Sequence, residues 1–358
     1  MLASEVSPWA KTGGLADVTG ALPQALERSG HDVTVVLPKY RGSALANATT
    51  TSRTVSLGGT TDAVTYHVAE MSPRRRVVMI DIPRYFDRDG YYGRDGHDFD
   101  DNAIRFAMLS AAALDFAEHD PERRPVDIVH AHDWQAGLAP TLLRIMPERY
   151  PRLSRAGLVF TIHNLAYQGL FPIEQHRELD LPVAQMGHDG LEFHGQGSFM
   201  KAGLLWADRV TTVSPRYALE ICTPAFGCGL EGLLANRGNA LSGILNGVDY
   251  RQWDPTTDRY LEKLYSARSL GGKTQCKAAL QKALGLNVDP HAPLFTVVSR
   301  LTDQKGMDLV LGALPHLLAL GGQLALLGSG DKRLEQAFEA AAKAQPAQVA
   351  VRIAYDEA

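Results

Sequence analysis

The feature that most constrains the fold of this chain is a regular alternation of short apolar runs with longer segments of helical periodicity. The apolar runs lie at residues 33–37, 126–130, 157–162, 210–213, 241–245, 294–299, 323–327 and 349–354. Between them, apolar side chains recur three and four positions apart, which is the spacing of a buried helical face. This alternation predicts an α/β architecture in which helices cover parallel sheets. Residues 51–82 hold short alternating segments instead, which predict a small β excursion.

A second series of strands and helices predicts a second domain. The first series ends near Asn246 and the second begins after Pro255, in a chain of 358 residues that is long enough for two domains. We therefore predict a first doubly wound domain at 1–246, a linker at 247–258 and a second domain at 259–358. The opening residues resemble the end of a strand, and no helix follows the last predicted strand. We accordingly expect both ends to be cut and the second domain to be incomplete.

Polar residues directly follow several of the predicted strands. These clusters lie at 130–134, 163–164, 246, 300–305 and 328–330. In open parallel sheets, ligands bind beyond the carboxyl ends of the strands. A single polar strand end is usually only turn chemistry, but repeated clusters at the same edge predict a functional cleft between the two domains.

The stretch from Lys11 to Asp17 opens the first predicted helix. Gly13 and Gly14 stand just before this helix, and residues without a Cβ let the backbone approach a ligand closely. The free N–H groups and partial positive charge of a helix N-terminus suit phosphate, and Lys11 adds a full charge. The alternative is a tight turn with a solvated lysine. The predicted buried face of the helix is Leu15, Val18, Leu22, Ala25 and Leu26.

The segment from Arg300 to Gly306 joins a predicted strand to a predicted helix. It offers a guanidinium, the ammonium of Lys305 and a helix N-terminus, which together can hold a diphosphate and stabilise it as it leaves. The alternative is a surface loop with two solvated cations. The nearby Gly328–Ser329–Gly330 turn lacks the third spaced glycine of a dinucleotide site, which disfavours a nicotinamide enzyme.

Composition indicates which classes of partner are not expected and which cellular compartment is. The formal net charge of −4 gives no electrostatic reason to expect nucleic acid or an anionic membrane as partner. The sequence has no apolar run of membrane-spanning length and no secretory signal. The three cysteines, Cys222, Cys228 and Cys276, lack metal-ligand spacing and predict reduced thiols in a cytoplasmic protein, although a Cys222–Cys228 bridge is conceivable.

Taken together, these stretches resemble the bacterial glycogen synthase family, which is the starch-synthase-like family of retaining glucosyltransferases with the two-domain, Rossmann-like GT-B fold. The resemblance spans essentially the whole chain, and its first and last carriers are highly specific for the family. The carriers are residues 11–18, 132–135, 161–169, 226–234, 245–249 and 299–306.

The resemblance implies a reaction and its partners. Glucose would pass from ADP-glucose to the non-reducing end of an α-1,4-glucan such as glycogen, with retention at the anomeric carbon and without a metal ion or other cofactor. Nucleic acid and membranes are not expected as partners, and the oligomeric state stays open. Two alternatives are a GT-B transferase that uses UDP-glucose and a non-catalytic glucan-binding fragment.

The resemblance also implies roles for individual residues. Lys11, Gly13 and Gly14 would meet the sugar nucleotide from the first domain. Catalytic roles would fall to Arg300 and Lys305 on the diphosphate, to His163 beside the transferred glucose, and to Asp133. The remaining substrate-binding positions would be Asn164 and Asn246 near the sugar or acceptor, Asp17 and Trp134 on the acceptor side, and Tyr355 near the adenine.

The chain departs from the family at one point. The family's acidic catalytic-site residue lies in a Glu-Pro-Cys-Gly-Leu segment, and this chain ends before such a segment. Glu357 belongs to the loop after the last predicted strand and is not that residue. We therefore expect the chain to lack part of the family's active site.

Some polar and aromatic residues also allow a metal site or sugar stacking. His130 and His132 share one face of a strand end, but no third ligand at suitable spacing accompanies them. The Asp-x-Asp segments at 87–89 and 98–100 resemble metal sites of other sugar transferases, but they lie in the polar loop 84–102, where solvated acids are the simpler interpretation. The aromatic candidates for stacking are Tyr92, Trp134 and Trp206, of which Trp206 is expected in the core.

Overall fold

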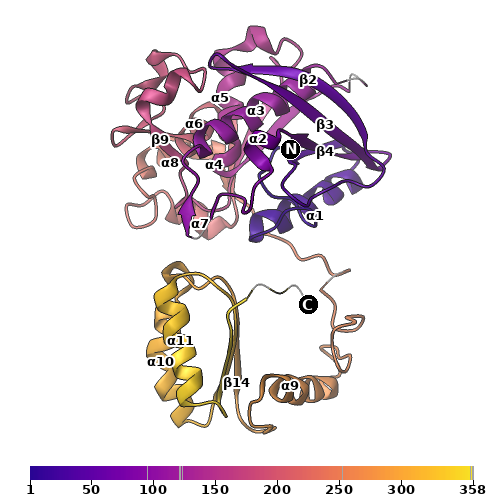
Figure 1. The fold of residues 1–358 in the computed structure, drawn as a ribbon, viewed down its shortest axis with the longest axis vertical. Coiled ribbons are helices and arrows are strands. Elements are labelled where there is room, and N and C mark those ends of the chain that lie inside the picture. Colours follow the sequence, from indigo (N-terminus) through magenta and orange to yellow (C-terminus); the bar gives the residue numbers. More distant parts are fainter. Residues whose placement is uncertain (95, 121, 123, 252, 355, 357–358) are drawn as a thin grey trace. The chain divides into compact units, whose positions relative to one another are not determined.

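The computed structural model describes residues 1–94, 96–120, 122, 124–251, 253–354 and 356. The chain divides into two compact units, Met1–Gly247 and Val248–Ala358 (Figure 1). The helices of the first unit are α1 (Gly14–Arg28), α2 (Pro83–Phe86), α3 (Asn102–Glu118), α4 (Asp133–Ala136), α5 (Leu138–Ile145), α6 (Phe199–Trp206), α7 (Pro215–Glu220) and α8 (Glu231–Asn236), with short 3₁₀ turns at Pro147–Arg149, Ile173–Arg177, Val183–Met186 and Gly238–Ala240. Its strands are β1 (Val33–Pro38), β2 (Thr49–Leu57), β3 (Thr60–Ser72), β4 (Arg75–Asp81), β5 (Gly93–Arg94), β6 (His97–Asp98), β7 (Ile128–His132), β8 (Gly157–Ile162), β9 (Leu170–Pro172), β10 (Glu192–Phe193), β11 (Gln196–Ser198), β12 (Arg209–Thr212) and β13 (Leu241–Gly243).

The main sheet of the first unit joins two groups of strands. One group has the order β13-β12-β8-β7 and is parallel throughout; the other has the order β1-β4-β3-β2. Leu2 connects them, because it forms parallel bridges to Val36 of β1 and to Ala131 of β7. The strand-like opening that the sequence predicts therefore lies between β1 and β7.

The predicted β excursion is confirmed as two antiparallel hairpins. β2 pairs with β3 and β3 with β4, while β4 pairs in parallel with β1. A second antiparallel sheet, with the order β10-β11-β9, was not predicted from the sequence. Its strands have only two or three residues each, which is too short for a recognisable alternation.

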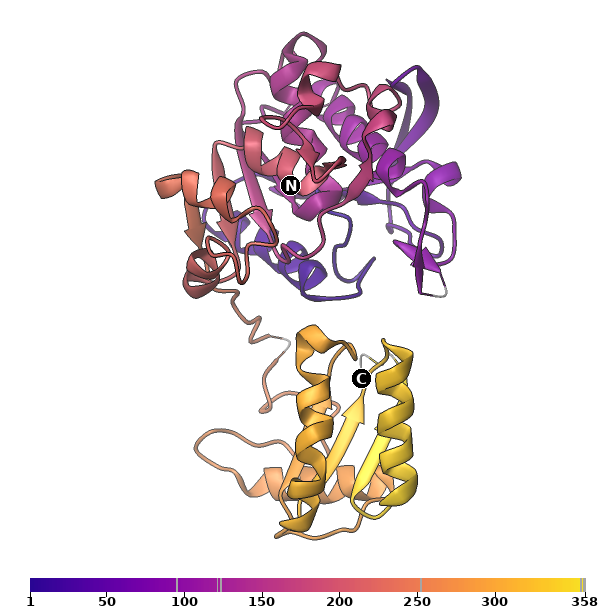
Figure 2. The same ribbon diagram turned by 90° about the vertical axis from the view of Figure 1, so that its left-hand side faces the viewer.

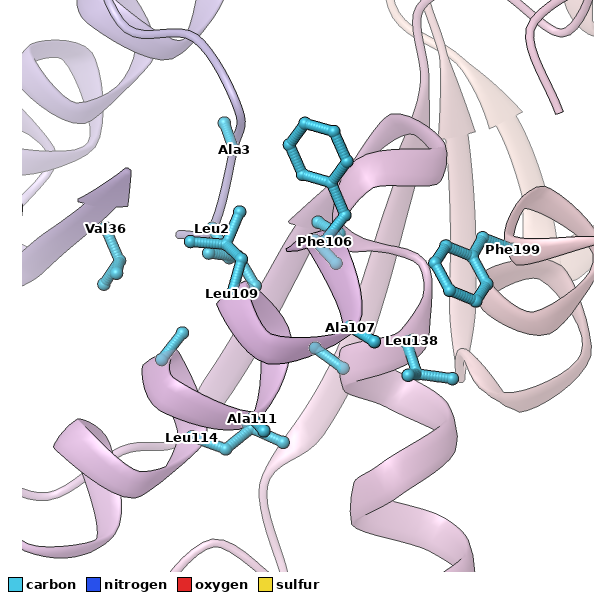
Figure 3. Close-up of a cluster of buried hydrophobic side chains, with 14 of the residues drawn as sticks. Leu2, Ala3, Val36, Phe106, Ala107, Leu109, Ala111, Leu114, Leu138 and Phe199 are labelled. Carbon is cyan, nitrogen blue, oxygen red and sulfur yellow. The ribbon is translucent and has the colours of Figure 1, made fainter. Parts of the chain in front are cut away.

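The core of the first unit gathers around α3. Phe106, Ala107 and Leu109 of this helix have no exposed surface. Figure 3 shows them between the opening residues, represented by Leu2, and Phe199 of α6. The helix thus fixes the start of the chain against the elements that follow β8.

Two helix predictions need correction. The single helical segment that the sequence predicts after the apolar run 126–130 forms two helices, α4 and α5, with a break at Gly137. The backbone of Gly137 lies against Phe199, so that a Cβ there would lie 2.1 Å from the Phe199 carbonyl oxygen. In α1, Leu15 is buried as predicted, but Thr19 is fully buried instead of the other predicted positions, which are only half-buried: Val18, Leu22, Ala25 and Leu26. The hydroxyl of Thr19 donates to the carbonyl of Glu5 at 2.6 Å. This polar side chain can therefore be buried, because its hydroxyl keeps a hydrogen-bond partner inside the protein.

The second unit is a three-stranded parallel sheet with helices on both faces (Figure 2). Its elements are α9 (Gly271–Leu284), β14 (Leu294–Val298), a 3₁₀ turn at Asp303–Lys305, α10 (Met307–Ala319), β15 (Gln323–Leu327), α11 (Lys332–Ala344) and β16 (Val349–Arg352). Leu324 and Leu326 pack with Phe338 of α11, whereas Ala325 packs on the α9 side with Leu284. The predicted α/β class with parallel sheets is confirmed in both units. Among the described residues, no helix combines the length and the apolarity that a membrane crossing requires.

Candidate active site

The loop from Lys11 to Gly14 is held from beneath by a buried carboxylate. Glu5 is 3% exposed; its Oε2 accepts the backbone N–H of Thr12, and its Oε1 accepts the Thr12 hydroxyl at 2.7 Å. The hydroxyl of Tyr92 also donates to Oε1 and lies 2.8 Å from Oγ of Ser4. Burial and the nearby Glu5 raise the pKa of Tyr92 well above its usual value, so this hydroxyl stays a donor. The loop is therefore fixed before any ligand arrives.

The other side of the same loop, at Gly13 and Gly14, is open. Gly13 precedes α1, and no side chain among the described residues caps the helix N-terminus. A Cβ built on Gly13 or on Gly14 would meet no described atom within 4 Å. Lys11 Nζ lies 3.0 Å from Oδ1 of Asp17, one turn into α1. The arrangement offers free helix N–H groups and an oriented ammonium, which is the chemistry that binds a phosphate.

Asp133 stands at the end of β7 in a conformation that L-residues rarely adopt, with φ of 54°. Its side chain is almost fully buried, and Oδ1 accepts the backbone N–H groups of His163 at 2.7 Å and Asn164 at 3.3 Å. Burial raises the pKa of Asp133 to about 7, against the lowering effect of these two hydrogen bonds. The carboxyl group thus ties the end of β7 to the end of β8, and it positions the two residues that follow β8.

Three histidines lie together beside Asp133. The rings of His130 and His132 stack at 4.1 Å, and Nδ1 of His132 lies 3.0 Å from Nε2 of His163. Burial lowers the pKa of His130 to about 3, of His163 to about 4 and of His132 well below its usual value. All three imidazoles are therefore neutral at pH 7. His132 is fully buried, whereas His163 is only half-buried and accessible to a ligand.

Trp134 is half-buried and packed into the unit rather than free to move. Its ring lies edge-on to Phe106 at 5.0 Å and tilted against Phe199 at 6.4 Å. Gly169, with φ of 60°, passes so close that a Cβ there would lie 2.2 Å from Cε3 of Trp134. The ring therefore has one fixed orientation, with part of its surface left for contact.

The other predicted site residues of the first unit are scattered more widely. Asn164 is half-buried beside His163, and its Oδ1 accepts the N–H of Ala166 at 3.1 Å. Asn246 is exposed beyond β13. Trp206, expected in the core, is half-buried. The structure thus brings Asp133, His163 and Asn164 together at the adjacent ends of β7 and β8.

In the second unit, the predicted cations lie on the connection from β14 to α10. Arg300 and Lys305 are both exposed, and Gly306, with φ of 68°, starts α10. The backbone of this connection is fixed by the turn after β15. A Cβ on Gly328 would lie 1.9 Å from the carbonyl oxygen of Ser299. Tyr355, predicted near the adenine, lies outside the described residues.

Sequence reasoning missed the residues that support the site from within. Glu5 gave no motif signal, although a carboxylate in an otherwise apolar opening segment is itself unusual. Arg105 is fully buried on α3, and its guanidinium donates to the carbonyls of Tyr85 at 2.7 Å and Tyr91 at 3.2 Å. It thereby anchors the 84–102 loop that carries Tyr92. Tyr92 was considered only for stacking of its ring on a sugar, whereas its hydroxyl donates a hydrogen bond to Glu5.

The first of the two acidic segments considered for metal binding has another partner. Arg41 donates to Asp87 at 2.8 Å and to Asp89 at 2.9 Å, which neutralises the first Asp-x-Asp segment. Within the described part of the chain, no three His, Cys, Asp or Glu side chains are grouped so that they could hold a metal ion. The three cysteines are free thiols, so the conceivable bridge is not formed.

The similarities to known proteins extend over both units. A family model described as the starch synthase catalytic domain matches residues 1–236. The chain is 47% identical over 362 residues to a glycogen synthase of Paramagnetospirillum magneticum, covering 99% of this chain and 72% of the relative. It is 48% identical over 360 residues to a glycogen synthase of an Anaeromyxobacter species, covering 99% and 74%. Among solved structures, the catalytic domain of starch synthase IV from Arabidopsis thaliana, bound to ADP and acarbose, matches with a TM-score of 0.88 at 32% identity, covering 99% of this chain and 74% of that chain.

Proposed function

Because this chain belongs to the starch and glycogen synthase family of glucosyltransferases, we propose that it transfers glucose from ADP-glucose to the non-reducing end of an α-1,4-glucan, with retention at the anomeric carbon. The observation that carries the proposal is the fixed, open loop at Lys11, Gly13 and Gly14. Its free helix N–H groups face outward while buried Glu5 holds it in place. The related starch synthase IV, bound to ADP and acarbose, supports a donor with an adenosine diphosphate moiety.

On the donor side, the first unit supplies Lys11 and the N-terminus of α1 for the sugar nucleotide. From the second unit, Arg300 and Lys305 hold the diphosphate. When the bond from C1 of glucose to the diphosphate breaks, negative charge grows on the leaving phosphate oxygens, and these cations stabilise it. The acceptor hydroxyl oxygen then bonds to C1 on the face that the diphosphate leaves, ADP takes the electron pair of the broken bond, and the proton of the acceptor hydroxyl passes to the leaving phosphate oxygen.

On the sugar side, His163 and Asn164 face the transferred glucose. Asp133 influences the glucose through these two residues, because Oδ1 of its carboxyl group accepts their backbone N–H groups. Trp134, Asp17 and Asn246 support the acceptor, and the family resemblance assigns Tyr355 to the adenine. The reacting sugar has an oxocarbenium-like transition state, for which neutral hydrogen-bond donors and fixed apolar surface are suitable neighbours.

The domain boundary and the compartment complete the proposal. Residues 247–258 connect the donor half in the second unit to the first unit as a linker. The free state of all three cysteines supports a reducing compartment, and we place the reaction in the cytoplasm.

The test measures donor binding and glucosyl transfer separately. ADP-glucose should bind in calorimetry, ADP should displace it, and ADP should be released when glycogen is present. UDP-glucose, run in parallel, tests the alternative donor. The matched control for Lys305→Ala is Lys343→Ala, which removes an exposed cation at the end of α11. A chain that binds neither nucleotide sugar, or a Lys305→Ala variant that behaves like Lys343→Ala, would contradict the proposal.

A further inference from the structure

One fully buried imidazole, that of His132, lies near the proposed site. His132 has no exposed surface, and its Nε2 has no hydrogen-bond partner among the described residues. Its other ring nitrogen, Nδ1, lies 3.0 Å from Nε2 of His163. The chain therefore buries an imidazole completely and uses only the nitrogen that contacts His163.

The hydrogen bond between Nδ1 of His132 and Nε2 of His163 has one proton, which is carried by one of these two nitrogens. Both imidazoles are neutral, since burial lowers the pKa of each. A neutral imidazole has one N–H donor and one bare acceptor nitrogen. Either His163 donates from Nε2 to His132, or His132 donates from Nδ1 to His163.

The unpartnered nitrogen decides between these two arrangements. If His163 donates, the proton of His132 must sit on Nε2, and the interior then holds an N–H group without an acceptor. If His132 donates, its Nε2 is only a lone pair without a donor. Orphaned buried N–H groups are rarer in proteins than under-satisfied acceptors. The second arrangement is therefore favoured, and it leaves the proton of His163 on Nδ1.

We infer that His132 is a positioning residue that holds His163 as its Nδ1–H tautomer, so that His163 presents a hydrogen-bond donor, and not a base, to an oxygen of the substrate. The inference deepens the proposed function and rests on it for the identity of the substrate oxygen as one of the transferred glucose. The structural basis is independent of that identity. His163 then stabilises a sugar oxygen without bringing positive charge next to the oxocarbenium-like centre.

The decisive measurement is the ¹⁵N NMR spectrum of the full chain with ¹⁵N-labelled histidine. Protonated and bare ring nitrogens have well separated ¹⁵N shifts, and the His163 signals are assigned by their loss in His163→Gln. We expect Nδ1 of His163 to be protonated and Nε2 to be bare. His132→Phe keeps a buried ring but removes the donor, so the two His163 tautomers should mix. His132→Asn places an amide N–H near the position of Nδ1 and should restore the single tautomer.

A matched control comes from the same stack of rings. His130→Phe also removes a buried imidazole, but His130 contacts the hydroxyl of Thr161 and not His163. This variant should leave the His163 spectrum unchanged. In glucosyl transfer, His132→Phe should lower kcat about tenfold with a smaller change in KM, and His132→Asn should recover most of it.

The outcomes separate this inference from the proposed function. Protonation of His163 at Nε2 in the unmodified chain overturns the inference, and so does a His163 spectrum that His132→Phe does not alter. If His132→Phe does not fold, the spectra of the unmodified chain and of His132→Asn still decide. If the chain neither binds nor transfers from ADP-glucose, the proposed function fails, while the tautomer is still read directly.

Discussion

The predicted site residues of the first unit and those of the second unit are supported in different ways. In the first unit, the residues at the site are braced by buried polar groups: Glu5 is 3% exposed, His132 is 0% exposed and Asp133 is 8% exposed. In the second unit, the predicted ligand groups Arg300 and Lys305 are exposed side chains on a connection that packs against the backbone of Gly328 and is tied to α11 by the ion pair between Asp303 and Arg333. The first unit therefore supplies preorganised geometry, and the second supplies exposed charge.

The hydrophobic core is also more continuous in the first unit than in the second. The first unit has one extended cluster of buried apolar side chains, whereas the second has a separate cluster on each face of its sheet. β14 carries the connection to α10 and is largely open, with Phe295 43% exposed and Val298 76% exposed. Substitutions of the buried groups that brace the first unit should consequently affect stability, whereas substitutions at open or exposed site positions of either unit should affect function alone. Each prediction below tests this division.

The largest effect is expected in the second unit. Lys305→Ala should lower the rate of glucosyl transfer about a hundred- to a thousandfold, because it removes a cation that stabilises the leaving diphosphate. The unfolding transition in urea should stay within about 0.5 kcal/mol of the parent chain, because the side chain is exposed. Kinetics and urea unfolding on the same preparation measure both. A marked loss of stability would break the comparison, since Lys305 would then be part of a braced structure.

Two glycines of the first unit give a sharper test. Gly169→Ala places a Cβ 2.2 Å from the Trp134 ring at a φ of 60°, so the free energy of unfolding should fall by about 3 kcal/mol. Gly13→Ala meets no described atom of the chain within 4 Å and should change stability by less than about 0.5 kcal/mol. It should nevertheless weaken ADP-glucose binding about tenfold, because the new methyl group occupies the ligand's side of the loop. Equal ADP-glucose affinity in Gly13→Ala and the parent chain would show that the open side of the loop is not the donor site.

The sequence predicted the fold and the exposed motifs better than the groups that brace them. The alternation of apolar runs with helical segments predicted the α/β class, and the motif at residues 11–18 predicted the family; both predictions are confirmed, as are the GT-B fold and the glucosyltransferase function. Strand ends and glycine turns are local signals. The support of Glu5 for Thr12 joins residues through the folded loop, and the contact between His132 and His163 depends on the pairing of β7 with β8.

The roles of the individual residues stay predictions for the same reason. A motif indicates that a carboxylate is important but not whether its oxygens face the ligand or the backbone. Asp133 illustrates this, because the sequence placed it among the catalytic residues, while its Oδ1 accepts two backbone N–H groups. The periodicity of α1 failed at Thr19 because a pattern of apolar residues cannot register a buried hydroxyl that finds an acceptor.

Glu5 allows the bracing itself to be measured. Glu5→Ala removes the acceptor of the Thr12 N–H, the Thr12 hydroxyl and the Tyr92 hydroxyl, and it should lower the free energy of unfolding by about 2 kcal/mol. Glu5→Gln keeps an acceptor oxygen of the same reach and should lose less. Urea unfolding and ADP-glucose calorimetry should rank both variants in the same order. Loss of affinity without loss of stability would mean that Glu5 contacts the ligand and does not brace the loop.

The smallest expected effect is a pH dependence set by Asp133. In the folded chain the pKa of Asp133 is raised to about 7 by burial, whereas its ordinary value is 3.8. Between these two values the folded state holds a proton that the unfolded chain releases. The contribution of Asp133 to the free energy of unfolding therefore falls as the pH rises through this window, and it is constant above about pH 7.

Asp133→Asn isolates this contribution, because asparagine has no proton to lose and its side-chain oxygen can still accept the N–H groups of His163 and Asn164. The free energy of unfolding of the variant, relative to the parent chain, should rise by about 1.4 kcal/mol between pH 5 and pH 6. The buried histidines act with the opposite sign in both proteins, since their lowered pKa values make unfolding take up protons below pH 6.5. Urea unfolding at several pH values provides the measurement. Parallel curves for the two proteins would mean that Asp133 is ionised in the folded state, so that the backbone N–H groups outweigh its burial and the first unit braces its site with a charge.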